Sequence, residues 1–226
     1  MGARYVANAY EISDKYENVL LDAEDAKVKI EASSDNNTKM FFFEKKRRPY
    51  EFAVQGNTLV IKARKARWYN FLRIGINNSE IKLCVTNSSL ESLSVVSNVG
   101  HIDVCSIACN GTINIRVNTG RLNLENVSCK ALETKGNTGS VYLNNFVATE
   151  NISIKRNTGK VVFNDCFAPE ICVKTNTGAV YGRLSANMEF IVRTNTGKIE
   201  TPRLQVGEAI SGRCEIKTNT GNVKFE

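Results

Sequence analysis

The chain has 226 residues, of which 42% are hydrophobic and 23% are charged, and 30 Lys and Arg against 23 Asp and Glu give a formal net charge of +7. This length supports one or two domains, and the composition excludes a disordered or fibrous chain. No run approaches about 18 consecutive apolar residues, so no membrane-spanning helix is expected.

Residues 1–80 are expected to form β-strands and a hairpin that cap the repeats that follow. Strands are predicted at Val28 to Ile30 and at Met40 to Phe43. The apolar segments Tyr50 to Val54 and Thr58 to Ile61 flank a Gly-Asn pair, which is typical of a hairpin. A cap is needed because an open sheet edge invites aggregation.

A basic region extends from Lys39 to Lys82, with eleven Lys or Arg against three Asp or Glu. Trp68, Tyr69 and Phe71 lie among these cations, and this combination is found in surfaces that bind nucleic acid or lipid headgroups. The alternative is that the cations line solvated hairpin edges and block unwanted strand pairing. We favour the second interpretation, so nucleic acid is not an expected partner.

The sequence Asn-Thr-Gly occurs six times after residue 115, preceded by the degenerate copy Asn98-Val99-Gly100. Successive glycines of these seven copies are 20, 19, 20, 19, 19 and 24 residues apart. A fixed period of this size is typical of solenoids, in which each repeat is one coil.

When the copies are aligned on their glycines, apolar residues recur at alternating positions on both sides of the turn. Two residues after the glycine stand Ile102, Leu122, Val141, Val161, Val180, Ile199 and Val223. Alternation of this kind predicts a half-buried strand before and after each turn. The apolar face of one coil can be buried only by its neighbours. We therefore predict an all-β, single-chain β-solenoid (β-helix) of about six coils of 19–24 residues, wound right-handed, with residues 1–80 as the cap and 81–226 as the repeats.

The turn asparagines are predicted to stack into a ladder, because each side-chain amide can donate to one neighbour and accept from the other. The ladder comprises Asn98, Asn118, Asn137, Asn157, Asn176, Asn195 and Asn219. We interpret it as a structural feature rather than a binding site.

A cation stands four residues before the glycine of each Asn-Thr-Gly copy. These candidate binding residues are Arg116, Lys135, Lys155, Lys174, Arg193 and Lys217. Because the flanking positions point inward, the six should project from one outer face in a line of roughly 24 Å. Like charges on neighbouring strands are destabilising, so the row of cations calls for an explanation, and the functional explanation is a docking strip for a polyanion. Alternatively, Lys is a common outward residue that duplicated repeats inherit without any role in binding.

No residue pattern predicts catalysis, a metal site or a cofactor. The sequence has no nucleophile elbow, phosphate-binding loop or calcium-binding nonapeptide repeat. The single histidine, His101, and the acids Asp103, Glu125 and Asp165 fall at different offsets from the turns, so we do not expect a catalytic pair. The seven cysteines show no metal-ligand spacing; Cys109 and Cys129 share one repeat position, which permits but does not require a disulfide.

Three features together resemble the bacterial "putative adhesin" domain family of unknown function. These are the hairpin that ends at Gly56 to Lys62, the strand Ile81 to Val85 with the apolar positions that follow it, and Asn-Thr-Gly with Val or Ile two residues later. The likeness spans roughly residues 15–226. It implies a β-solenoid that is often tethered to the cell envelope by a preceding membrane segment. This sequence departs from the family in lacking that anchor, and in having Cys84 where many members have proline.

These observations favour a non-catalytic, adhesin-like binding module of the cell envelope that docks an anionic glycan, a wall polymer or lipid headgroups on the basic line. The anchor would lie outside this sequence, and a cytoplasmic location is the other possibility. The alternative is a structural or regulatory envelope-stress scaffold that self-associates through the solenoid ends, since the chain stops within a predicted strand at Phe225 and Glu226. A polysaccharide-active β-helix enzyme ranks third.

Overall fold

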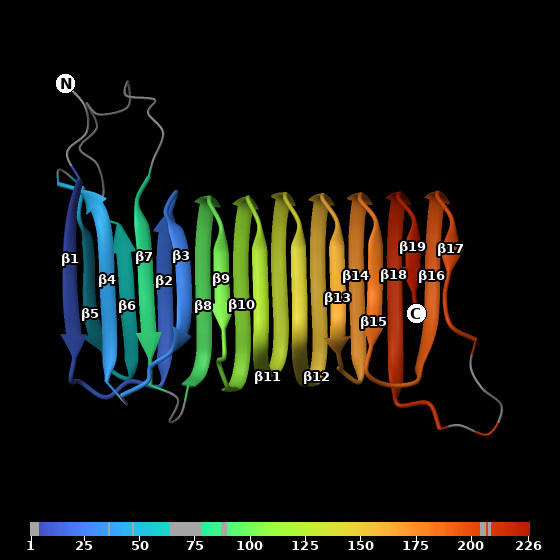
Figure 1. The fold of residues 1–226 in the computed structure, drawn as a ribbon, viewed down its shortest axis with the longest axis horizontal. Helices are drawn as coiled ribbons and strands as arrows, with labels where there is room; N and C mark the ends of the chain where they lie inside the picture. Colours follow the sequence, from blue (N-terminus) through green and yellow to red (C-terminus); the bar gives the residue numbers. More distant parts are fainter. Residues whose placement is uncertain are drawn as a thin grey trace.

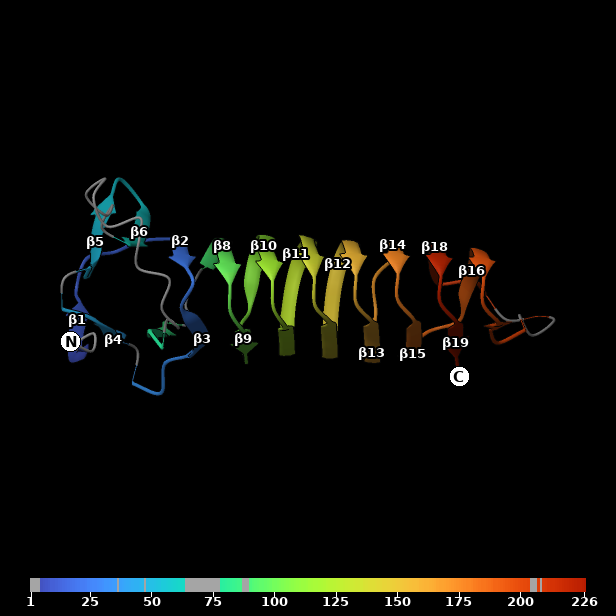
Figure 2. The ribbon, with the colours of Figure 1, turned by 90° about the horizontal axis from the view of Figure 1, so that it is seen from above.

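The computed structural model describes residues 5–35, 37–46, 48–63, 78–86, 90–203, 207 and 209–226. These residues form strands, turns and loops without a helix, and the strands make one continuous sheet of 19 strands. The sheet is folded into two facing layers that run the length of the molecule (Figures 1 and 2). Trp68, Tyr69 and Phe71 of the basic region lie outside the described residues.

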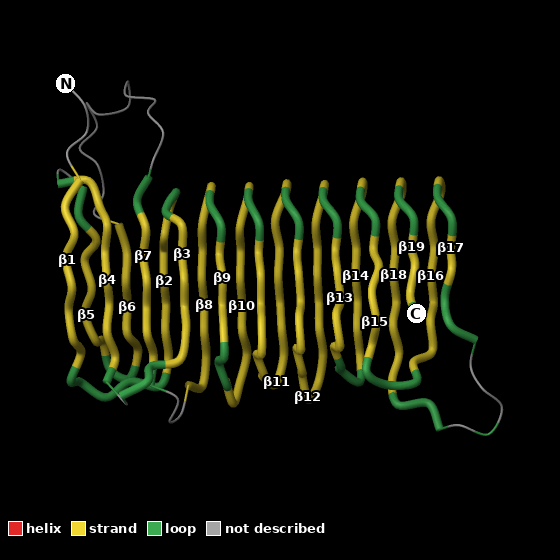
Figure 3. The backbone as a smooth tube through the Cα atoms, viewed as in Figure 1, coloured by secondary structure: helices red, strands yellow, loops and turns green. Residues whose placement is uncertain are grey.

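The repeat region winds back and forth between the two layers, as the chain tube in Figure 3 shows. Its strands are β8 (Leu90–Val99), β9 (Ile102–Cys105), β10 (Cys109–Thr119), β11 (Leu122–Thr138), β12 (Val141–Thr158), β13 (Val161–Cys166), β14 (Glu170–Thr177), β15 (Val180–Leu184), β16 (Met188–Thr196), β17 (Ile199–Glu200), β18 (Gly212–Thr220) and β19 (Val223–Phe225). The predicted strand on each side of every turn is confirmed. The hand of the winding and the number of coils stay predictions.

We call the layer that leads into the Asn-Thr-Gly turns the entry layer and the layer that leaves them the exit layer. In the entry layer, β8, β10, β11, β12, β14, β18 and β16 pair in parallel in that order. In the exit layer, the order is β9, β11, β12, β13, β15, β19 and β17. Strands β11 and β12 belong to both layers because each bends near its middle.

The core lies between the two layers and is built from the apolar positions that the repeat predicts. Leu132, Ile152, Leu143 and Phe163 are completely buried, and each packs on the equivalent residue of the next coil. Because the same offset faces inward in every coil, burial of one coil depends on its neighbours, as expected for a solenoid.

The N-terminal strands extend both layers. They are β1 (Tyr5–Ile12), β2 (Asn18–Glu24), β3 (Lys27–Ala32), β4 (Thr38–Lys45), β5 (Tyr50–Gln55), β6 (Thr58–Ala63) and β7 (Glu80–Val85). β2 and β3 pair in parallel with β8 and β9, and the predicted hairpin is confirmed by the antiparallel pairing of β5 with β6. Whether the chain divides at residue 80 stays a prediction.

The expectation that the chain ends at the far end of the solenoid is wrong. The last strands, β18 and β19, lie between β14 and β15 on one side and β16 and β17 on the other, so β16 and β17 form the terminal coil (Figure 1). The 24-residue spacing before the last turn provides the extra length for this return. Pro202 suits the outer position, since proline has no backbone N–H to donate to a further strand.

Candidate functional site

The turn glycines stack on one another along one edge of the solenoid, and this contact fixes the register of the entry layer. A Cβ atom on Gly120 would overlap the carbonyl oxygen of Gly100, and a Cβ on Gly139 would overlap that of Gly120. The same contact recurs along the remaining turns. At the far end Gly221 stacks on Gly178, and Gly197 stacks on Gly221. Only glycine allows the backbones to approach this closely.

The seven turn asparagines are all exposed on the outer surface beside this glycine stack. Asn137 donates from Nδ2 to Asn118 Oδ1 at 2.6 Å, and Asn219 donates in the same way to Asn176. These two links join neighbouring turn asparagines, and the continuous ladder of seven stays a prediction. The second link also follows the revised coil order, because the neighbour of Asn176 is Asn219 and not Asn195, the next turn asparagine in the sequence.

The six predicted cations lie on paired strands in one unbroken, in-register column, which we call the basic column. In spatial order they are Arg116, Lys135, Lys155, Lys174, Lys217 and Arg193. All six side chains are exposed. The register therefore brings together every candidate binding residue, with Lys217 and Arg193 exchanged relative to chain order.

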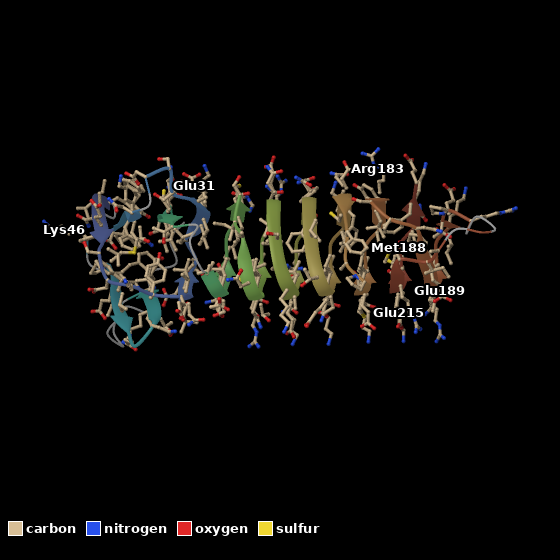
Figure 4. The ribbon with its side chains drawn as sticks, turned by 90° about the horizontal axis from the view of Figure 1, so that it is seen from below. Glu31, Lys46, Arg183, Met188, Glu189 and Glu215 are labelled. Atoms are coloured by element: carbon tan, nitrogen blue, oxygen red, sulfur yellow. The ribbon has the colours of Figure 1, made fainter. Side chains whose placement is uncertain are left out.

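The basic column lies in an open groove of about 840 Å³ on the outer side of the entry layer. Arg116, Lys135, Lys155, Lys174 and Lys217 line it together with turn asparagines, whereas Arg193 is not among its lining residues. Val117 also lines the groove although its side chain is fully buried, so strand backbone forms the floor. Seen along the layers, Glu189 and Glu215 project from the same side of the molecule as the entry layer, and Arg183 projects from the opposite side (Figure 4).

Most charges of the basic column have no acidic partner. Lys135 Nζ lies 4.0 Å from a carboxylate oxygen of Glu133, and both side chains are about half exposed, which makes this pair weak. No ion pair involves the other groove cations within the described part of the chain. Among the exposed cations of the groove, four thus have no acidic partner and one, Lys135, has a weak one.

A neighbouring column on the same layer shows that uniform charge is not a general property of these repeats. Four residues before the basic column, Glu170, Arg213 and Glu189 occupy successive in-register positions and alternate in sign. Opposite charges on adjacent strands are the stabilising arrangement. The basic column therefore lacks the charge alternation that the chain uses nearby.

A buried cation lies on the inner side of the same strands and was missed by the sequence analysis. Arg156 is 4% exposed, donates from Nη1 to the Val117 carbonyl and from Nη2 to Thr134 Oγ1, each at 3.0 Å, and has no partner for Nε. Burial lowers the pKa of its guanidinium to about 10. A Cβ on Gly136 would overlap Arg156 Nη1, so glycine makes room for it.

Each of these residues departs from the repeat pattern: Thr134 replaces an aliphatic residue, Gly136 is the only glycine in its column, and Arg156 is the only charged residue there. Three exceptions on two neighbouring coils are a signal that could have revealed this internal cluster from the sequence.

The acids considered for catalysis come from three different coils. Asp103 pairs across the ladder with Asn123, Glu125 pairs with Cys105, and Asp165 lies on a third coil. Asp165 accepts from Arg183 Nε and Nη2 at 2.8 Å each, and this contact lowers the pKa of its carboxyl group. His101 is exposed, and its Nδ1 accepts from the Arg121 backbone N–H at 3.3 Å.

The described residues contain no group of three or more His, Cys, Asp or Glu side chains that could hold a metal ion. All seven cysteines are free thiols, Cys109 and Cys129 included. Burial raises the pKa of the Cys129 thiol to about 12, which keeps it protonated and unreactive.

The fold and the groove define a β-solenoid that exposes an ordered row of cations. Residues 16–226 match the family described as Toastrack DUF4097, and the chain belongs to this family. No curated protein matches the chain.

Among solved structures, the chain is similar to a putative cell adhesion protein from Clostridium sporogenes, with 10% identity over 98% of this chain and 99% of the other, and a TM-score of 0.47. A putative adhesin from Parabacteroides distasonis has 11% identity over 99% and 98% of the two chains, with a TM-score of 0.48. A protein of the same organism described as a putative lipid binding protein has 14% identity over 97% of each chain, with a TM-score of 0.45. Across the described residues, no helix is long and apolar enough to cross a membrane.

Proposed function

We propose that this protein is a non-catalytic binding module of the cell envelope that holds a linear polyanion along the groove of the entry layer. The observation that carries the proposal is the in-register column of five cations in one groove, four of them without an acidic partner.

The energetic argument starts from the repulsion within the basic column. Two unit charges about 5 Å apart repel by about 0.8 kcal/mol in water, and more where the protein excludes solvent. Neighbouring coils are about 4.8 Å apart, so each cation between the two ends of the column has a like charge on both neighbouring strands, and each end cation has one. An anionic chain laid along the groove replaces this repulsion with attraction, and the stacked turns hold the cations in line before the ligand arrives.

The shape of the groove favours a chain-like ligand over a flat membrane surface. The cations stand in single file, and turn asparagines such as Asn118 and Asn137 border them with amide donors and acceptors. A wall polymer or an acidic glycan with charge in every unit can follow such a line, whereas anionic lipid headgroups are spread over two dimensions. The proposed ligand is therefore a polyanionic polymer of the envelope, and lipid headgroups are the comparison ligand.

Binding of a poly(glycerol phosphate) chain, measured by titration calorimetry at about 50 and 200 mM salt, tests this function. We expect affinity to fall steeply with salt, and the double variant Lys155→Glu/Lys174→Glu to bind at least about 10-fold more weakly at low salt, since two central attractions become repulsions. The matched control Lys130→Glu/Lys198→Glu makes the same change in net charge at exposed positions outside the groove.

If both double variants lost the same affinity for the polymer, binding would depend only on the net charge of the protein, which would contradict a site in the groove. If the protein bound phosphatidylglycerol vesicles more strongly than the polymer, the ligand of the groove would be lipid headgroups and not a polymer.

A second candidate function, assembly through the solenoid end, is favoured by the terminal coil. Strand β16 pairs only with β18 and β17 only with β19, among the described residues. Ile199 on this coil is 48% exposed, although its position is buried in the inner coils. A scaffold of this kind would associate with rising concentration in sedimentation experiments, equally in the wild type and in the Lys155→Glu/Lys174→Glu variant.

A further inference from the structure

A second hollow lies on the exit layer, on the opposite side of the solenoid from the basic column. Its volume is about 580 Å³, and its lining includes Asn164, Tyr181, Gly182, Arg183, Asn222 and Lys224. These residues come from the neighbouring strands β13, β15 and β19 and the turn before β19. Arg183 marks this side of the molecule in Figure 4. The volume falls in the range of about 300 to 1,000 Å³ that is usual for small-molecule sites.

Tyr181 gives this hollow an aromatic wall whose position is fixed by a neighbouring coil. Lys160 Nζ lies 5.8 Å from the centre of the Tyr181 ring and 5.2 Å from that of Tyr142, so one ammonium group bridges both rings. Neither Lys160 nor Tyr142 lines the hollow. A cation over a tyrosine ring is attracted by about 0.5 to 1 kcal/mol at an exposed site, which helps to hold the ring in place.

The two asparagines add unused hydrogen-bonding groups of both kinds. Asn222 Oδ1 accepts from the Lys198 backbone N–H at 2.9 Å, which leaves its NH₂ group to donate. Asn164 donates from Nδ2 to Asn144 Oδ1 at 2.6 Å, which leaves its carbonyl oxygen to accept. A ligand in the hollow thus meets a donor and an acceptor beside an aromatic ring.

The cations around the hollow are paired with carboxylates, in contrast to most of those in the basic column. Arg183 makes its two-pronged contact with Asp165, and Lys224 Nζ lies 3.4 Å from Glu226 and 3.9 Å from Glu200. Each cation already has an acidic neighbour, so the hollow offers little net charge to attract an anion. Its polar lining is equally unsuited to a purely apolar ligand.

We propose that this hollow is a binding site for a neutral sugar ring. A pyranose has an apolar C–H face that can pack on the Tyr181 ring, and hydroxyl groups around its edge that both donate and accept hydrogen bonds. The Asn222 amide and the Asn164 carbonyl meet those hydroxyls, and the ion-paired side chains exclude ligands of high charge. The site is independent of the proposed polyanion groove.

Saturation-transfer NMR and titration calorimetry with glucose, galactose, N-acetylglucosamine and their disaccharides test this site. We expect at least one of these sugars to bind, with an affinity that is unchanged between about 50 and 500 mM salt because no net charge is involved. The variant Tyr181→Ala should bind it at least about 10-fold more weakly, since the stacking surface is lost. The matched control Tyr142→Ala removes a tyrosine from the same layer outside the hollow and should bind within about twofold of the wild type.

Asn222→Ala provides a second test at an exposed position, in case Tyr181→Ala fails to fold, and should weaken binding several-fold. The proposal is overturned if none of these sugars binds the folded protein at tens of millimolar concentration, or if Tyr142→Ala weakens binding as much as Tyr181→Ala. A sugar-binding signal that disappears in Lys155→Glu/Lys174→Glu, with Tyr181→Ala unaffected, would place the ligand in the groove and also overturn it. Loss of polyanion binding alone would leave the sugar site intact.

Discussion

At the scale of single residues, two small side chains define the solenoid edge: glycine, which allows backbones to touch, and asparagine, which links exposed turns. The glycines are the more demanding of the two, because the backbone atoms that a Cβ would meet cannot move aside. The asparagines lie at the surface, where water can replace a lost hydrogen bond. We therefore attribute the register of the basic column mainly to the glycine stack.

The variant Gly120→Ala tests this attribution. The added Cβ would overlap the Gly100 carbonyl group, so we expect a loss of at least about 3 kcal/mol in the free energy of unfolding, measured by urea denaturation. Gly56→Ala is the control, because nothing lies within 4 Å of the added atom and only the positive φ of 63° disfavours alanine. That change should cost about 1 kcal/mol. Equal losses in the two variants would argue against close stacking.

The ion pairs of Glu31 in the N-terminal strands make the stability of the protein depend on pH in the acidic range. Its carboxylate contacts Lys29 Nζ at 2.5 Å and Lys82 Nζ at 2.7 Å, and these hydrogen bonds lower its folded pKa from 4.5 to about 2. A lowered folded pKa stabilises the protein above pH 4.5, and this contribution is lost progressively as the pH falls from 4.5 through 2.

Since both lysines are about half exposed, we expect solvent screening to limit the contribution to about 1 kcal/mol. Urea denaturation should therefore show Glu31→Gln to be less stable than the wild type by this amount at neutral pH, with the difference shrinking from pH 4.5 downward and vanishing only below pH 2. If the stability difference between the wild type and Glu31→Gln did not shrink with falling pH, it would not come from the ionised Glu31 carboxylate.

At the scale of elements, the repeat predicted most of the fold. The alternation around each Asn-Thr-Gly predicted the strands from β8 onward, and the offset of Lys155 and its equivalents predicted an outward column on one layer. The order of the last two coils could not be predicted, because Phe190 and Cys214, or Val192 and Ile216, are interchangeable partners for the coil beneath. The internal Arg156 cluster was missed because alignment emphasises what repeats share and not where they differ.

Disulfide formation between engineered cysteines tests the revised coil order. In the variant Lys174→Cys/Lys217→Cys the two residues occupy paired positions, and a spacing of about 4.8 Å lies within the Cα range of a disulfide. We expect oxidation to join them, as detected by peptide mass mapping against the background of the native thiols. In Lys174→Cys/Arg193→Cys the residues are two strands apart, about 9.6 Å, which is too far to bridge. If oxidation instead joined residues 174 and 193 preferentially, the coils would be stacked in the order of the sequence, and the revised coil order would be wrong.

At the scale of the whole molecule, the solenoid separates two kinds of surface on opposite layers. The entry layer carries the basic groove, and the exit layer carries a charge-balanced hollow beside a row of cation–aromatic contacts. The spacing of the cations follows from the spacing of strands and needs no flexible loop to set it. The molecule therefore offers a rigid line of charge whose length grows with the number of stacked coils.

Lysine acetylation mapped by mass spectrometry, with and without poly(glycerol phosphate), tests the central claim most directly. If the polymer lies along the groove, Lys135, Lys155, Lys174 and Lys217 should all be protected by the ligand at low salt, while Lys130 and Lys198 should react as they do in the free protein. Protection spread evenly over all exposed lysines, or absent from the four groove lysines, would contradict the proposed function.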